Sequence, residues 1–316
     1  MPASLTRRLL LGSALLYPSL ALIAGRAFAQ QADDPTVPPP ELPTPAVPDA
    51  RVEEDADKLL AELEKRTGGR LGVSILDTET NISLGHRETE RFPLCSTYKA
   101  LAAAFVLARV DQGKEQLDRR VTYGKDVVVS YSPATESHAG TDGMTVAELC
   151  QAAVTLSDNT AGNLLLDSFG GPEALTLWLR STGDDQTRLD RREPDLNEAK
   201  KDDPRDTTTP DAILDTLGLL TLGNTLADKS SDILTGWLVA NTTGGERLRA
   251  GVPSGWKVGD KTGTGQNGSA ADIAIFWPPE RGPILVAAYV AEATAPIKDI
   301  NAVFADIGKL AAGMAG

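Results

Sequence analysis

Residues 92–99 read Phe-Pro-Leu-Cys-Ser-Thr-Tyr-Lys, and they open an Ala/Leu-rich run that predicts a helix from Tyr98 to Val110. The segment sets the hydroxyl of Ser96 three residues before the amine of Lys99. Residues three apart on a helix share a face, so we expect the two groups within hydrogen-bond reach. A neutral lysine beside a serine can take its proton and make it a nucleophile without a histidine. The segment therefore predicts a helix that begins at a reactive serine.

Two kinds of apolar periodicity surround this helix. Alternation with period two predicts strands at 70–77, 82–86, 256–264, 269–277 and 284–291. Helical spacing predicts helices at 52–66, 98–110, 145–156, 161–169, 172–180, 210–222, 232–240 and 297–314. Thr145 and Glu148 fit a capping box. The first helix should bury a stripe made of Ala56, Leu59, Leu60 and Leu63.

This order of elements predicts a chain that leaves a sheet, builds a helical lobe and returns to the sheet. The sheet should be antiparallel, because a short turn joins its last two strands. We predict an α/β (α+β) fold in which helices flank an antiparallel sheet built from both chain ends, plus an all-α lobe. The cleft between two such lobes is a favoured place for a ligand.

The chain divides into three parts by composition. Residues 1–29 are typical of a cleaved export signal, with Arg7 and Arg8 before an apolar core and a small-x-small cleavage site. The paired arginines favour twin-arginine export, and an ordinary secretory signal is the alternative. Residues 30–50 form a Pro-rich linker. Residues 51–316 form the catalytic domain, with an α/β lobe at about 51–92 and 243–316 and an α lobe at about 93–242.

Charge and rare residues exclude several function classes. The net charge is −13, and removal of the signal takes away three arginines and no acid, which gives −16. Such a surface repels nucleic acid and anionic membranes, and it suits an exported, monomeric enzyme with a small substrate. With two histidines in the chain, His86 and His138, a multi-histidine zinc site is hard to build, and we expect no metal and no cofactor. The two cysteines, Cys95 and Cys150, are predicted to stay free.

Four motifs carry the chemistry. Besides Ser96 and Lys99 they are Ser157-Asp158-Asn159, Glu193-Pro194-Asp195-Leu196-Asn197 and Lys261-Thr262-Gly263-Thr264-Gly265. The second follows an apolar helix, the third lies in a polar stretch, and the fourth ends a predicted strand. Each has an ordinary explanation alone, since such residues are common at helix caps, in solvated loops and at strand ends.

Together the motifs resemble the signature of the class A serine β-lactamases, which combines Ser-x-x-Lys with Ser-Asp-Asn and Lys-Thr-Gly. The likeness covers about residues 51–316 and includes Tyr131-Ser132-Pro133 and the stretches 188–199 and 206–210. Order and spacing both agree with the family. The resemblance implies the β-lactamase/transpeptidase-like fold, a β-lactam antibiotic as substrate, and antibiotic resistance.

The resemblance implies the catalytic roles. Ser96 would attack the lactam carbonyl, and Lys99 would assist the proton transfer. Whether this lysine or Glu193 is the base of acylation is disputed for the family. Ser157 would protonate the leaving nitrogen. Glu193, with Asn197, would hold the water that hydrolyses the acyl-enzyme.

The resemblance also implies the substrate-binding set, which is Tyr131, Asn159, Asn197, Lys261, Thr262, Gly263, Thr264 and Arg247. The N–H groups of Ser96 and Thr264 would form the oxyanion hole. Many relatives carry an arginine where this chain has Ala270, and Arg247 would replace it near the substrate carboxylate.

The same resemblance describes the segment that carries Glu193. A pair between Arg191 and Asp206 would close it as an Ω-loop, and a cis bond would precede Pro194. The alternative is an exposed ion pair that contributes ~0–1 kcal/mol.

Two other functions compete with β-lactam hydrolysis. A penicillin-binding D-Ala-D-Ala carboxypeptidase shares two of the motifs but lacks the loop acid. A β-lactam sensor would acylate and stop. Glu193 is the residue that separates both from a hydrolase that turns over.

Overall fold

Both ends of the described chain contribute strands to one sheet. The computed structural model describes residues 50–316, all within one compact unit, so the predicted export signal and nearly all of the linker lie outside the described residues. The strand order is β2-β1-β9-β8-β7, and every neighbouring pair is antiparallel. The strands are β1 (Arg70–Asp77), β2 (Ile82–His86), β7 (Lys257–Thr264), β8 (Ala270–Trp277) and β9 (Ile284–Ala291). The prediction of an antiparallel sheet built from both chain ends is confirmed.

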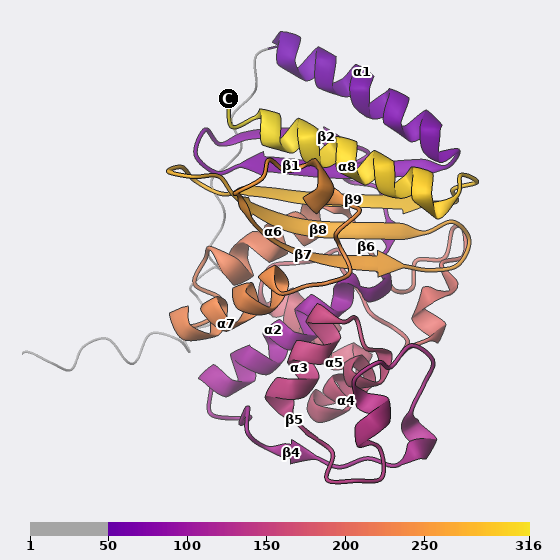
Figure 1. Cartoon of the computed structure of the whole chain (residues 1–316), viewed down its shortest axis with the longest axis vertical. Coiled ribbons are helices and arrows are strands. Elements are labelled where there is room, and N and C mark those ends of the chain that lie inside the picture. The colour runs from indigo at the N-terminus through magenta and orange to yellow at the C-terminus, as the bar shows by residue number, and fades with distance from the viewer. Residues whose placement is uncertain (1–49) are drawn as a thin grey trace, which may run out of the picture. The chain divides into compact units, whose positions relative to one another are not determined.

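Helices cover both faces of this sheet (Figure 1). On one face lie α1 (Ala50–Thr67) and α8 (Ile297–Gly313). Side chains along a strand alternate between the faces. On β8, for example, Ala274 and Phe276 pack with α1 and α8, whereas Ile273 and Ile275 pack with the helices of the other face. Leu59 was expected in the buried stripe of α1 but is 40% exposed. The buried stripe is narrower than predicted and consists of Ala56, Leu60 and Leu63.

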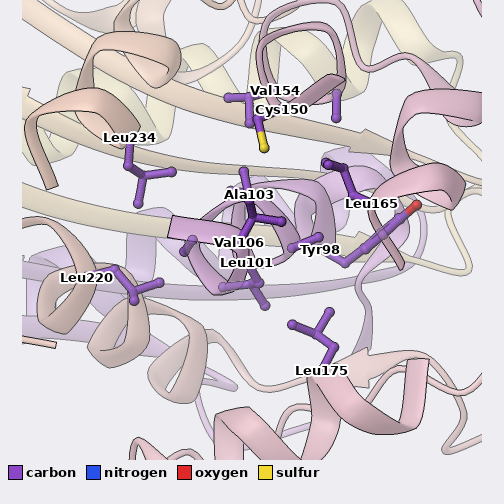
Figure 2. Close-up of a cluster of buried hydrophobic side chains, with 14 of the residues drawn as sticks. Tyr98, Leu101, Ala103, Val106, Cys150, Val154, Leu165, Leu175, Leu220 and Leu234 are labelled. Carbon is purple, nitrogen blue, oxygen red and sulfur yellow. The ribbon is translucent and has the colours of Figure 1, made fainter. Parts of the chain in front are cut away.

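The helix α2 (Tyr98–Asp111) lies at the centre of the helical part, as Figure 2 shows. Buried side chains from each helix around it pack against it. A helix that is apolar on every side is expected in a core. The surrounding helices are α3 (Val146–Thr155), α4 (Asn159–Phe169), α5 (Pro172–Ser181), α6 (Pro210–Thr221) and α7 (Asp228–Val239).

Three helices begin earlier than the periodicity predicts, and the first of them is α1, which starts at Ala50 and not at residue 52. The start of α7 is Asp228 and not residue 232, because Asp111 accepts hydrogen bonds from Ala227 N and Ser230 Oγ and so fixes a polar first turn. The start of α4 is Asn159 and not residue 161, because Asp158 caps it. At α3 the predicted capping box is confirmed.

Two pairs of very short strands were not predicted. One joins β4 (Arg120–Val121) to β5 (Met144–Thr145), and the other joins β3 (Phe92–Pro93) to β6 (Thr207–Thr208). The second pair sets the residues just before Ser96 against a segment that lies more than a hundred residues later. Each of these four strands has two residues, which is too few to show a period.

Asp158 connects α4 to the loop before it. Its carboxylate is fully buried and accepts hydrogen bonds from Ala134 N, from both the N–H and the hydroxyl of Thr135, and from Ala161 N at the start of α4. Four donors from two segments therefore depend on one side chain.

We expect Asp158→Ala to lower the free energy of unfolding by about 3 kcal/mol, because it leaves buried N–H donors without an acceptor. Urea unfolding followed by circular dichroism measures this change. Asp167→Ala is the control, since Asp167 lies in the same helix and is exposed. Equal effects of the two substitutions would contradict the assignment.

Candidate active site

Ser96 lies in a short 3-10 helix, Cys95–Thr97, that leads directly into α2. Cys95 has a left-handed backbone with φ of 45°. Strand β7 approaches this turn closely, because a Cβ on Gly263 would stand 2.9 Å from Cys95 Cβ and 3.2 Å from Ser96 N. Only glycine permits this approach, and it brings the end of β7 beside the serine.

The amine of Lys99 is the centre of the site. It is fully buried and donates to Ser96 Oγ at 3.0 Å, to Ser157 O at 2.8 Å and to Asn159 Oδ1 at 2.6 Å. It also forms an ion pair with Glu193 Oε1 at 2.9 Å. Burial lowers the pKa of Lys99, and the negative charge of Glu193 opposes this shift only in part. The burial therefore favours the neutral amine.

Glu193 reaches the same serine from a distant loop. Ser96 Oγ donates to its Oε1 at 3.3 Å, and Asn197 Nδ2 donates to its Oε2. Asn163 holds the backbone of Glu193 on both sides, since its Oδ1 accepts from Glu193 N and its Nδ2 donates to Glu193 O, each at 2.9 Å. The peptide bond before Pro194 is cis, as expected. Asn197 Oδ1 is buried and has no hydrogen-bond partner among residues 50–316.

An ion pair closes the neck of this loop. Arg191 Nε donates to Asp206 Oδ2 at 2.6 Å, and the backbone N–H groups of Asp190 and Arg191 donate to Asp206 Oδ1. Asp206 is only 1% exposed, so the pair is not an exposed surface pair. Asp206 O accepts from Leu94 N at 2.8 Å, and the β3–β6 pair lies beside it. The predicted pairing is confirmed, and it joins the loop to the turn before Ser96. We call residues 188–206 the Ω segment.

Lys261 and Ser157 form a second buried pair on the other side of the serine. Lys261 Nζ donates to Ser157 Oγ at 3.0 Å and to Thr262 O at 2.8 Å. The amine is fully buried and contacts no carboxylate among the described residues. Burial first, and then the charge of Lys99, lower the pKa of Lys261 to about 7.

Asn159 joins α4 to the segment that carries Tyr131. Its Nδ2 donates to Ser130 O at 2.8 Å, and its backbone N–H donates to Tyr131 O at 3.0 Å. Tyr131 is 62% exposed, which is high for an aromatic side chain. Farther along, the hydroxyl of Thr262 is hydrogen-bonded to that of Thr243.

Arg247 lies against the end of β7. Its guanidinium donates to Gly263 O and Ala271 O, both at 2.7 Å, to Thr264 Oγ1 at 2.8 Å and to Asn301 Oδ1 at 3.0 Å. Arg247 is 6% exposed and Thr264 is exposed, so the hydroxyl lies on the outer side of the cation.

Comparisons with known proteins agree with this geometry. The pattern of the β-lactamase enzyme family matches residues 53–314. The chain belongs to the β-lactamase enzyme family. It is 45% identical to β-lactamase AST-1 of Nocardia asteroides over 95% of this chain and 93% of that protein. It is 48% identical to the carbapenem-hydrolyzing β-lactamase KPC of Klebsiella oxytoca over 79% and 86% of the two chains.

Solved structures narrow the family to class A. An ancestral (GNCA) class A β-lactamase is 61% identical, with a TM-score of 0.81, over 82% of this chain and 99% of that one. The present chain is therefore an enzyme of class A that hydrolyses the β-lactam amide bond, and its α/β fold is the fold of that class.

Several other features take no part in the contacts described for the site. Both cysteines are free and buried, Cys95 beside Ser96 and Cys150 within α3. His86 contacts Glu64, and no histidine contacts Ser96. A cavity of about 430 Å³ lies between the Ω segment and the ends of β1 and β9, and none of the motif side chains lines it. Among the residues described, no cluster of side chains could hold a metal ion, and no helix is long and apolar enough to cross a membrane.

Sequence reasoning missed Asn163, which holds Glu193 in this β-lactamase. It lies one turn after Asn159 on α4. Two asparagines four residues apart on a helix share a face, and this was the available signal. Their partners lie on different loops, which the spacing does not reveal.

Lys261 makes the stability of this β-lactamase depend on pH. The unfolded chain holds the lysine proton up to about pH 10.5, whereas the folded enzyme loses it near pH 7. Between these values the unfolded chain binds more protons, so stability from this group rises with pH and is lost as pH falls toward 7.

We therefore expect Lys261→Met to raise the free energy of unfolding by roughly 2 kcal/mol at pH 6.5 and by clearly less at pH 9.5. Urea unfolding at the two pH values measures the difference. Lys257→Met is the control, because Lys257 is exposed on the same strand. A gain that is the same at both pH values would disprove the buried cation as its cause.

Proposed function

We propose that this enzyme opens the β-lactam ring of penicillins and cephalosporins through an acyl-enzyme on Ser96, which a water activated by Glu193 then hydrolyses. One observation carries the proposal. The hydroxyl of Ser96 has the amine of Lys99 at 3.0 Å and the carboxylate of Glu193 at 3.3 Å. Both groups are buried with the serine, so a base for acylation and a base for deacylation lie at one oxygen.

Acylation requires a proton path from the serine to the leaving nitrogen. As Ser96 Oγ bonds to the carbonyl carbon, its proton passes to Lys99, or to Glu193 through a water, and both alternatives stay open. The C–N bond then breaks, and Ser157 gives its hydroxyl proton to the nitrogen. Lys261, at 3.0 Å from Ser157 Oγ, can restore that proton. A pKa near neutrality suits Lys261 to proton transfer.

Deacylation depends on the pair of Glu193 and Asn197. The carboxylate of Glu193 accepts from the side-chain amide of Asn197, whose own oxygen is buried and unpartnered. A water there has two acceptors for its two hydrogens, and Glu193 can take one of them as a base. The water oxygen bonds to the acyl carbon, the ester bond to Ser96 breaks, and the proton returns to the serine oxygen.

The other end of the site carries the cations that a substrate carboxylate needs. Lys261 and Arg247 flank the end of β7, where the exposed hydroxyl of Thr264 contacts the guanidinium. A developing oxyanion needs N–H donors, and those of Ser96 and Thr264 are the candidates, with Gly263 allowing the two segments to approach. Tyr131 is exposed and would form a wall of the entrance, with Asn159 binding the side-chain amide of the substrate.

Glu193 also separates the proposal from its alternatives. A D-Ala-D-Ala carboxypeptidase or a β-lactam sensor would share Ser96 and Lys99 but would lack a buried acid held by Asn163 and Asn197. Class A β-lactamases are exported, and we propose a periplasmic or secreted monomer, free of the membrane after removal of residues 1–29, with the twin-arginine route as the favoured one. One relative is named for carbapenem hydrolysis, so carbapenems belong in the substrate panel.

We expect Glu193→Gln to acylate and then stop, because the amide cannot take a proton from water. A chromogenic cephalosporin should give one burst, and intact mass should show a lasting adduct on Ser96. Asp195→Asn is the control, since it neutralises an exposed acid two residues away. Turnover by Glu193→Gln at the parent rate would mean that the base is misassigned, and a parent enzyme that itself stops after one burst would favour the sensor.

We expect Arg247→Ala to raise KM about tenfold for substrates with a free carboxylate, with little change in kcat, because a charged hydrogen bond contributes ~1.5–3 kcal/mol. The matched test uses the methyl ester of the same cephalosporin, for which the parent and the variant should have similar KM. If KM rises equally for the acid and the ester, the arginine supports the strand and does not bind the carboxylate.

A further inference from the structure

Tyr98 carries a polar group that the proposed mechanism does not use. It is the residue just before Lys99 and is fully buried, and its side chain extends away from α2 (Figure 2). Its hydroxyl has no hydrogen-bond partner among residues 50–316. A buried hydroxyl without a partner costs roughly 1–3 kcal/mol relative to an apolar group of the same shape. A phenylalanine would avoid that cost.

The hydroxyl lies against the part of α4 that holds the catalytic groups. A Cβ on Gly162 would stand 2.5 Å from Tyr98 Oη and 3.1 Å from Lys99 Cε. Glycine at this position therefore leaves room for the tyrosine hydroxyl and for the lysine stem together. The next residue on α4 is Asn163, which binds the backbone of Glu193 on both sides. The hydroxyl thus packs against the residue that directly precedes Asn163 in the chain.

The electrostatic surroundings of the Tyr98 hydroxyl also involve the carboxylate of Glu193. After burial, the negative charge of Glu193 is the largest cause that raises the pKa of Tyr98, followed among acids by Asp206, and Arg192 opposes them. The hydroxyl therefore remains protonated, and a hydrogen bond donated by it toward this negative charge would be favourable. Glu193 Oε2 accepts one hydrogen bond from a protein group, that of Asn197, and a carboxylate oxygen has room for a second.

We infer that Tyr98 is a positioning residue for Glu193: its hydroxyl donates to a buried water beneath the Ω segment, and this water supports the carboxylate that activates the deacylating water. The inference rests on the proposed function of Glu193. Buried polar groups that lack a protein partner are commonly satisfied by ordered water, which itself needs two or more polar partners. The Tyr98 hydroxyl and the Glu193 carboxylate would supply such partners, since the hydroxyl packs against Gly162 and the next residue, Asn163, holds Glu193.

The test is Tyr98→Phe, which removes one oxygen and keeps the ring. Acylation, measured in a single turnover, should be unchanged. Deacylation should slow about fivefold, the equivalent of one ordinary hydrogen bond. The acid limb of its pH profile should move to higher pH, because the loss of a donor favours the protonated carboxyl. A crystal structure of the parent should contain a water within hydrogen-bond distance of Tyr98 Oη.

Tyr123→Phe is the matched control. It removes a buried hydroxyl that donates to Thr135 O at 2.9 Å, away from Glu193. It should lower stability and leave the pH profile of deacylation in place, so a shift common to both variants would overturn the inference. The inference would also be overturned if Tyr98→Phe were more stable than the parent with the same deacylation rate and pH profile.

The two possible failures are distinguishable. If Glu193→Gln deacylates at the parent rate, the proposed function fails, and the inference fails with it. If Glu193→Gln traps the adduct while Tyr98→Phe keeps the parent profile, only the inference fails.

Discussion

A buried lysine amine with partners from several parts of the chain is the interaction on which this enzyme depends. Lys99 is fully buried, and its amine contacts the turn before α2, the residues before α4, and the Ω segment. A charge in such surroundings is costly unless it is paired. The amine therefore holds its partners in place in either protonation state, as a cation paired with Glu193 or as a neutral base beside Ser96. The contacts of this amine thus both hold the site together and make Ser96 reactive.

The position of Glu193 follows from contacts that are distant in sequence. The Ω segment returns to the protein through the β3–β6 pair and through the buried carboxylate of Asp206, which Arg191 and two backbone N–H groups neutralise. Asn163 then holds the loop from inside. Ordering a long irregular segment costs conformational entropy, and these contacts offset it at both ends and in the middle. The segment is thereby rigid where the carboxylate must meet the serine.

The sequence predicted what depends on local pattern. The helix that begins at Ser96, the hairpin of β1 and β2, and the capping box at Thr145 each follow from neighbouring residues, and so does their class of fold. Other contacts between distant segments were not predicted, such as Asn163 with Glu193 and the pairing of the two-residue strands β3 and β6. The early start of α7 was not predicted for the same reason, since Asp111 on another helix fixes it. Of the site, the motif residues and the pair of Arg191 and Asp206 could be named from sequence, whereas Asn163, which holds the backbone of Glu193, could not.

Several buried polar atoms without a hydrogen-bond partner lie where the chemistry is, whereas those of Arg109 and Arg281 lie elsewhere in the described chain. Among the described residues, Asn197 Oδ1 and Tyr98 Oη lie near Glu193, and Asp272 Oδ1 lies in the strand beside Lys261. Two lysines, Lys99 and Lys261, are also buried there with lowered pKa. A sequence selected for stability alone would replace such groups with apolar ones, because each is costly to bury. The two buried lysines and the polar atoms beside them suit this region to bind polar molecules and to move protons. The apolar core around α2 must supply the stability that the site gives up.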